Sequence, residues 1–139
     1  ALGLSQLKKL SKFKKRRKEI AKIYDDNFKN NDIFTIPYVN KNCGHAYHLY
    51  PLRINFNKME HKKKLFQELY NKKINLQVHY IPIHLQPYYK KKYNFQKGDY
   101  PIAEKFYEQE VSLPIFYSLK DKDITKIIKF IKSFFEKNI

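Results

Sequence analysis

An amphipathic pattern fills residues 1–29 and limits the folds open to this chain. Its apolar residues recur at spacings near three, four and seven, which predicts one helix; they are Leu4, Leu7, Leu10, Phe13, Ile20, Tyr24 and Phe28. At 1.5 Å per residue this helix would be roughly 40 Å long, more than a domain of this size needs internally. No capping residue precedes the pattern and there is no initiator Met, so we expect the chain to begin within a helix that connects two domains.

Residues 30–139 predict a small α/β (α+β) domain, in which helices cover about three strands of a mixed or antiparallel sheet. Alternating or short apolar runs predict the strands, at 48–56, 76–83 and 111–116. Helical spacing predicts the helices, at 57–74, 101–108 and 121–137. We expect 33–42 to be irregular and 84–89 to be a loop with one turn of helix.

Two of these helices have informative starts. Asn57 and Glu60 have the spacing of a capping box, which predicts the start of the helix at 57–74. The helix at 121–137 carries Asp121 and Asp123 near its positive N-terminal end. Its single apolar stripe is the clearest in the sequence and consists of Ile124, Ile127, Ile128, Ile131, Phe134 and Phe135.

The chain is strongly basic, with 29 Lys+Arg against 13 Asp+Glu and a net charge of +16. Such a charge favours an anionic partner, and a standalone basic module that binds phosphates, nucleic acid or an acidic membrane surface stays open as an alternative. Its contacts would be Lys8, Lys9, Lys12, Lys15, Arg16 and Lys22. Because arginine supplies most bidentate contacts to nucleic acid and is rare here, while residues with AT-rich codons are abundant, we expect neither a nucleic-acid nor a membrane partner.

Several classes of protein are disfavoured by what the sequence lacks. It has no run approaching the ~18 apolar residues of a membrane span and nothing that resembles a signal peptide, and its one cysteine fits a reducing compartment, so we expect a cytoplasmic protein. With three glycines, it has no motif for a phosphate-binding loop, a nucleophile elbow or a zinc protease.

Two clusters of side chains are candidates for chemistry. Cys43, His45 and His48 have a spacing that can bind zinc, with His79 or His84 as a fourth ligand; the alternative is a turn before a strand. Residues 78–89 combine two imidazoles, an amide and three phenols after a predicted strand. This composition suits a ligand-facing wall, or else tethered core tyrosines with surface or capping histidines.

Four segments carry a resemblance to a known family: Ala1–Leu7, Ala46–Tyr50, Val78–Tyr89 and Ser112–Phe116. Over nearly its whole length the chain resembles the C-terminal part of the DegT/DnrJ/EryC1/StrS aminotransferases, and the segment Val78–Tyr89 is the most specific. It is most similar to members that aminate C4 of a UDP-linked 4-keto-6-deoxy-N-acetyl sugar in pseudaminic acid biosynthesis.

The resemblance implies the small C-terminal domain (30–139) of a fold-type I aminotransferase that uses pyridoxal phosphate, joined by the connector helix (1–29) to a large domain that is absent here. The Schiff-base lysine belongs to that large domain, so the resemblance implies no catalytic residue, bound cofactor or activity in the isolated chain. It implies substrate-side contacts to the nucleotide sugar, none of them a general base, at His79, Tyr80, His84, Gln86 and Tyr88. A homodimer, or self-association through helix 1–29, is also expected.

Overall fold

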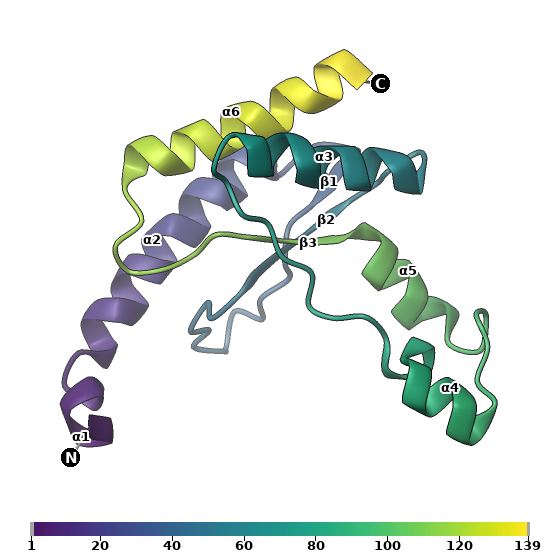
Figure 1. Cartoon of the computed structure of the whole chain (residues 1–139). Coiled ribbons are helices and arrows are strands. Elements are labelled where there is room, and N and C mark those ends of the chain that lie inside the picture. The colour runs from purple at the N-terminus through teal and green to yellow at the C-terminus, as the bar shows by residue number, and fades with distance from the viewer. Residues whose placement is uncertain (1, 139) are drawn as a thin grey trace.

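The computed structural model describes residues 2–138, which form helices around one three-stranded sheet (Figure 1). The strands are β1 (Phe34–Thr35), β2 (Tyr50–Ile54) and β3 (Glu110–Leu113). The helices are α1 (Leu2–Leu7), α2 (Leu10–Phe28), α3 (Met59–Asn71), the 3-10 turn η1 (Ile83–Leu85), α4 (Pro87–Tyr93), α5 (Pro101–Gln109) and α6 (Asp121–Asn138). The sheet order is β1-β2-β3 and both pairs are antiparallel, which confirms the predicted small α+β domain.

The central strand β2 has one buried face. Tyr50, Leu52 and Ile54 are fully buried while Arg53 points to solvent, as the alternation of the sequence predicts. Tyr50 is paired with Leu113 and Leu52 with Val111, so the apolar residues of β2 and β3 share this face. The predicted strand at 48–56 is therefore confirmed over Tyr50–Ile54.

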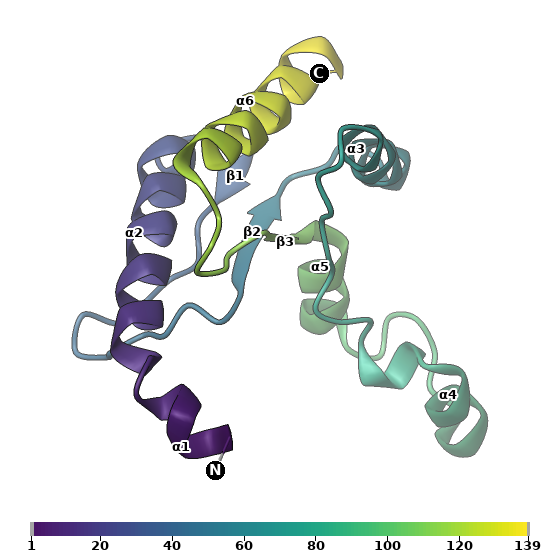
Figure 2. The same ribbon diagram turned by 60° about the vertical axis from the view of Figure 1, so that its left-hand side comes forward.

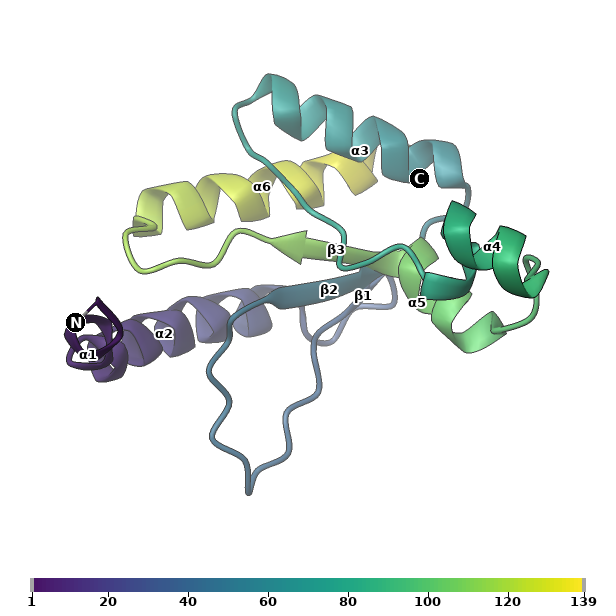
Figure 3. The same cartoon turned by 60° about the horizontal axis from the view of Figure 1, so that its bottom comes forward.

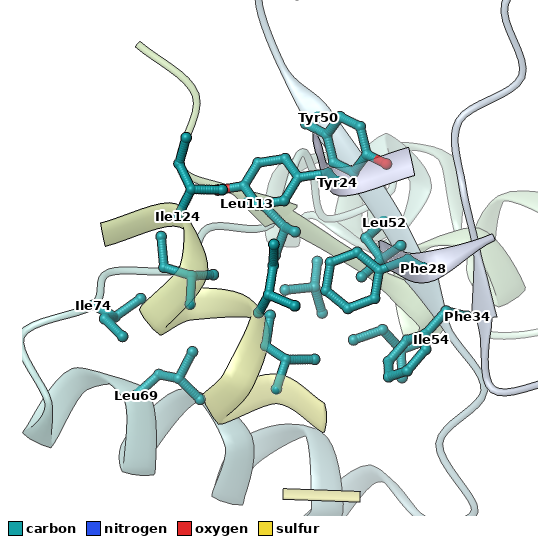
Figure 4. Packing of buried hydrophobic residues seen from close by; sticks show 14 of the residues in the cluster. Tyr24, Phe28, Phe34, Tyr50, Leu52, Ile54, Leu69, Ile74, Leu113 and Ile124 are labelled. Carbon is teal, nitrogen blue, oxygen red and sulfur yellow. The ribbon is translucent and has the colours of Figure 1, made fainter. Parts of the chain in front are cut away.

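Helices α2, α3 and α6 cover the apolar face of the sheet and complete the core. The whole predicted stripe of α6, from Ile124 to Phe135, is buried. Figure 4 shows Tyr24 and Phe28 of α2 gathered with Tyr50, Leu52 and Leu113 of the sheet. The Tyr24 and Tyr50 rings lie 4.9 Å apart between centroids. Both ends of the chain thus contribute to one core.

Strand β3 is buried on both faces, and its second face is polar. Val111 and Leu113 point into the core, so alternation places Glu110 and Ser112 on the opposite side. Both polar residues are nonetheless buried, Glu110 completely, because the chain that follows α3 runs beside β3 (Figure 3). Buried polar groups need partners, and this side of the sheet supplies them.

The prediction of a strand at 76–83 is wrong. Gln77 makes one isolated bridge to Ser112, and the ladder ends there because the next backbone N–H in register, that of His79, donates to the carboxylate of Glu110 at 2.9 Å. The third strand is instead β1, inside the segment expected to be irregular. Phe34 pairs with Ile54, and a pairing across some twenty residues leaves no local signal in the sequence.

Three predicted boundaries also change. The predicted single helix at 1–29 is divided by a turn at Lys8–Lys9. Helix α1 buries none of its residues, and a short helix without packing contacts is only marginally stable. The capping box is wrong, because α3 begins after Lys58 with no side-chain cap. Strand β3 ends at Leu113 because Pro114 has no N–H to donate. The predicted helices at 101–108 and 121–137 are confirmed as α5 and α6.

Two parts of the molecule extend away from the core in different directions. Helix α1 continues beyond the sheet at one end, and the segment from η1 through α4 forms an arm at the other end (Figures 1 and 2). The predicted turn of helix within 84–89 is confirmed by η1 and the start of α4. The polar aromatic segment, residues 78–89, therefore begins beside β3 and then continues into this arm.

Candidate functional site

A hollow of about 380 Å³ lies where the segment after α3 passes the second face of β3. Two of the predicted contact residues, His79 and Tyr80, line it. Its other walls come from α2, from the loop before β2, from the segment after α3, and from the end of β3 with the residues that follow it. They include Arg17, His48, Gln77, Ser112 and Phe116. Residues far apart in the sequence thus meet at one polar and aromatic surface.

The side chain of His79 is held from behind by a chain of hydrogen bonds. Its Nδ1 lies 2.7 Å from Oγ of Ser112, and Ser112 donates to Oε1 of Glu110 at 2.5 Å. The second carboxylate oxygen of Glu110 accepts the backbone N–H of His79. Glu110 therefore fixes both the backbone and the ring of His79, and the ring is left partly exposed at the hollow.

Tyr80 and Arg17 form contrasting parts of the wall. The Tyr80 side chain is 73% exposed, with its ring edge-on to that of His79 at 4.7 Å, so its hydroxyl is open to a ligand. Arg17 is committed, since its Nη1 donates to the carbonyl oxygens of Tyr47 and His48, each at 2.9 Å. It orders the loop before β2 and places a positive charge at the rim of the hollow.

The other predicted contact residues lie in the arm. His84 is buried, with Nε2 2.8 Å from Oε1 of Glu104 and its ring 4.8 Å from that of Tyr100. Gln86 is half-buried at the junction of η1 and α4. Tyr88 is exposed on α4, where its hydroxyl accepts a hydrogen bond from Lys92. The structure therefore brings together His79 and Tyr80 at the hollow, and separates them from His84, Gln86 and Tyr88.

The buried pair of His84 and Glu104 makes the arm sensitive to acid. The hydrogen bond from His84, followed by that from the backbone N–H of Gly98, lowers the pKa of Glu104 below its ordinary value of 4.5. The pair therefore stabilises the arm fully at pH values above the ordinary pKa of 4.5. This stabilisation is lost as the pH falls through the lowered pKa of Glu104. We expect the amides of residues 83–100 to lose protection against hydrogen exchange, relative to their intrinsic exchange rates, selectively in this acidic range.

In Glu104→Gln the same amides should already be less protected at neutral pH, with little further loss of protection on acidification. Glu68→Gln, which alters an exposed carboxylate on α3, serves as the control and should leave the arm protected. Equal acid sensitivity in the wild type and in Glu104→Gln would show that the pair does not hold the arm.

The alternative sites of the sequence find little support in the geometry. Within residues 2–138 no group of three or more His, Cys, Asp or Glu side chains is placed to hold a metal ion. Cys43 is exposed, and Nδ1 of His45 accepts the backbone N–H of Tyr47. Arg16, proposed for phosphate binding, donates to Asp121 and to the carbonyl of Leu119, each at 2.6 Å. Over the same described range, no helix is both long enough and apolar enough to cross a membrane.

Sequence reasoning missed Glu110, Ser112 and Arg17 as members of the site. A signal for the first two exists, because they alternate with Val111 and Leu113 and so mark a polar face on an otherwise apolar strand. For Arg17 the signal is its residue type. Arginine is scarce in this lysine-rich chain, and its planar fork suits fixed contacts to two carbonyl groups.

Lys62 is the one lysine that is buried in the described part of the chain. It borders a second, more apolar hollow of about 580 Å³ between α3 and α5, and burial lowers its pKa. Its Nζ donates to the carbonyl oxygen of Tyr107 at 2.5 Å and lies 5.1 Å above the Tyr107 ring. The amine is therefore engaged by the protein itself.

Comparison with known protein families gives one assignment for the chain. Residues 1–132 match the model of the DegT/DnrJ/EryC1/StrS aminotransferase family. Among curated proteins, the chain is 41% identical to the uncharacterized protein MJ1066 of Methanocaldococcus jannaschii, over 99% of this chain and 36% of that protein. It is 35% identical to the UDP-4-amino-4,6-dideoxy-N-acetyl-beta-L-altrosamine transaminase of Helicobacter pylori, over 98% of this chain and 36% of that protein.

A solved structure gives the same result. PseC of Helicobacter pylori, an aminotransferase involved in the biosynthesis of pseudoaminic acid, superposes with a TM-score of 0.87 at 34% identity. The superposition covers 98% of this chain and 36% of PseC, so the chain spans about a third of the length of the proteins it matches. The family match covers nearly the whole sequence and the fold agrees with it; the chain therefore belongs to the DegT/DnrJ/EryC1/StrS aminotransferase family.

Proposed function

We propose that this chain is the small C-terminal part of a nucleotide-sugar aminotransferase and that its hollow forms one wall of the sugar site. The main support for this proposal is that His79, Tyr80, Arg17 and Ser112 together line one polar and aromatic hollow. Sugar rings and bases offer hydroxyls and flat faces that imidazole and phenol groups bind well. The names of the relatives favour a UDP-linked 4-keto-6-deoxy-N-acetyl sugar of pseudaminic acid biosynthesis, aminated at C4, as the substrate of the whole protein.

Members of this family depend on pyridoxal phosphate, which supplies the electron sink of the reaction when it is bound. The described residues of this chain do not fit that group. The amine of the one buried lysine is already hydrogen-bonded to a carbonyl, and Gly3, Gly44 and Gly98 are too scattered to shape a phosphate loop. We propose that the isolated chain contributes substrate contacts but has no transaminase activity. We also propose that the protein is cytoplasmic.

Ligand binding by the hollow can be tested without catalysis. We expect UDP-N-acetylglucosamine, titrated into the labelled chain, to shift amide resonances of Gln77–Tyr80 and Ser112–Phe116, with a weak, millimolar-range affinity because only one wall contacts the ligand. His79→Ala should abolish these shifts, whereas His45→Ala, which lies outside the lining of the hollow, should not. Shifts that map instead to the arm, or an unaffected titration in His79→Ala, would refute this placement of the site.

We also propose that the chain self-associates through the apolar stripe of α1 and the start of α2. Leu2, Leu4 and Leu7 are 76%, 69% and 63% exposed, and no residue of α1 is buried. An apolar stripe of this kind on a helix favours association with another copy. This dimer stands as a proposal for the 139-residue chain alone.

Light scattering after size exclusion should give a mass above the 17.0 kDa of one chain at high concentration. Replacing Leu4 and Leu7 together by Lys should restore the monomer. The matched control is Ile102→Lys, at a side chain that is 86% exposed on α5 and outside the stripe, and it should leave the association intact. A wild type that stays monomeric at high concentration would contradict the proposal.

A further inference from the structure

The three side chains behind the hollow have an unusual order. Serine, histidine and glutamate are the residues of a hydrolase triad, in which the acid contacts histidine and histidine accepts the serine proton. Here the serine lies in the middle: Ser112 donates to Glu110, and the Oγ lone pairs face Nδ1 of His79. Since the serine proton is engaged by the carboxylate and Ser112 is buried, the cluster is not arranged for nucleophilic attack.

The direction of these hydrogen bonds determines where the imidazole proton lies. A hydroxyl has one proton, and that of Ser112 is used on Glu110. The 2.7 Å contact between Oγ and Nδ1 then requires Nδ1 to be the donor. A neutral imidazole carries one proton, so Nε2 is left with its lone pair. No residue in 2–138 forms a hydrogen bond to this Nε2, and the ring lines the hollow.

We propose that Glu110 and Ser112 are positioning residues that hold neutral His79 as its Nδ1–H tautomer, so that Nε2 accepts a hydrogen bond from a hydroxyl or N–H group of the ligand. The nature of that ligand, a sugar nucleotide, rests on the proposed function; the tautomer does not. An acceptor-only group, such as a carbonyl oxygen, placed opposite Nε2 would leave two lone pairs facing each other. This relay of hydrogen bonds, from Glu110 through Ser112 to His79, therefore selects for a hydrogen-bond donor at this point of the substrate.

The tautomer can be measured directly on the 139-residue chain. Long-range proton–nitrogen correlation spectra of the 15N-labelled histidines distinguish a protonated from an unprotonated ring nitrogen. At about pH 8, above the ordinary histidine pKa of about 6.5, we expect the wild type to show Nδ1 protonated and Nε2 unprotonated at His79.

Glu110→Gln should reverse this pattern while keeping the shape of the side chain. Its amide oxygen can still accept the backbone N–H of His79, so its NH₂ group faces Ser112. The serine hydroxyl then donates to Nδ1 and the ring proton moves to Nε2. Ser112→Ala, a second variant with a smaller change, should abolish the preference for Nδ1–H. Glu104→Gln, which alters the buried His84–Glu104 pair of the arm, should leave the His79 resonances unchanged.

An Nε2–H ring in the wild type, or an unchanged tautomer in folded Glu110→Gln and Ser112→Ala, overturns the proposal. The result is separable from that of the proposed function. An Nδ1–H ring in a chain that shows no shift with UDP-N-acetylglucosamine would support the relay and count against the sugar site. The opposite combination would support the site and overturn the relay.

Discussion

Replacing Tyr24 by alanine should lower the free energy of unfolding by about 3–5 kcal/mol, the range for a large aromatic side chain removed from a core. The Tyr24 side chain is completely buried and its ring contacts those of Phe28 and Tyr50. Its hydroxyl donates to the carbonyl oxygen of Pro114 at 2.8 Å. One side chain therefore joins α2 to the sheet and to the end of β3. Urea unfolding followed by circular dichroism measures the change.

Tyr24→Phe separates the ring from the hydroxyl. It keeps the aromatic packing and removes only the hydrogen bond to Pro114, so it should cost about 1 kcal/mol. A loss in Tyr24→Ala no larger than that in Tyr24→Phe would show that the core closes without this ring. Such a result would contradict the packing described for α2 against the sheet.

Alkaline pH should destabilise the fold through the same region. Burial raises the pKa of Tyr24 above its ordinary value of 10.0, and burial, reinforced by the hydrogen bond to Asp25, raises that of Tyr50. The neutral phenols therefore contribute stability that is complete below pH 10 and is lost as pH rises toward the raised pKa values. At pH 11 each phenol should have lost roughly 1 kcal/mol, and the two together roughly 2–3 kcal/mol.

The double variant Tyr24→Phe/Tyr50→Phe isolates this effect, because it keeps both rings and removes both ionisable hydroxyls. Its free energy of unfolding should fall less between pH 9 and pH 11 than that of the wild type, by roughly 2–3 kcal/mol. The comparison cancels the titration of the lysines, which are the same in both chains. Equal alkaline losses in the two proteins would show that these phenols ionise freely in the folded state.

The parts of the fold that the sequence predicts well are those that local periodicity determines. The apolar stripe of α6 and the alternation of β2 place their residues on one face whatever their partner, and both are buried as expected. Strand β1 and the segment after α3 depend on partners distant in sequence. Phe34 pairs with Ile54, and Gln77 pairs only with Ser112, and neither pairing has a local pattern.

In the candidate site, too, the sequence predicts what depends on local composition and misses what depends on distant partners. The density of polar aromatic residues singled out residues 78–89, and two members of this segment, His79 and Tyr80, line the hollow. Composition does not reveal that His84, five residues after His79, turns away to pair with Glu104. Nor does it reveal Glu110, because a buried carboxylate becomes meaningful only when the backbone N–H and the serine that it binds are known.

We propose that this member of the DegT/DnrJ/EryC1/StrS family supplies substrate contacts and does not bind pyridoxal phosphate by itself. The most direct test is the absorbance of the purified chain incubated with pyridoxal phosphate, before and after an amino donor is added, with Lys62→Met as a matched control because Lys62 is buried beside a hollow. We expect no stoichiometric band that responds to the donor in either protein. A stoichiometric, donor-sensitive band that maps to one lysine would place the catalytic centre in this chain and contradict the proposal.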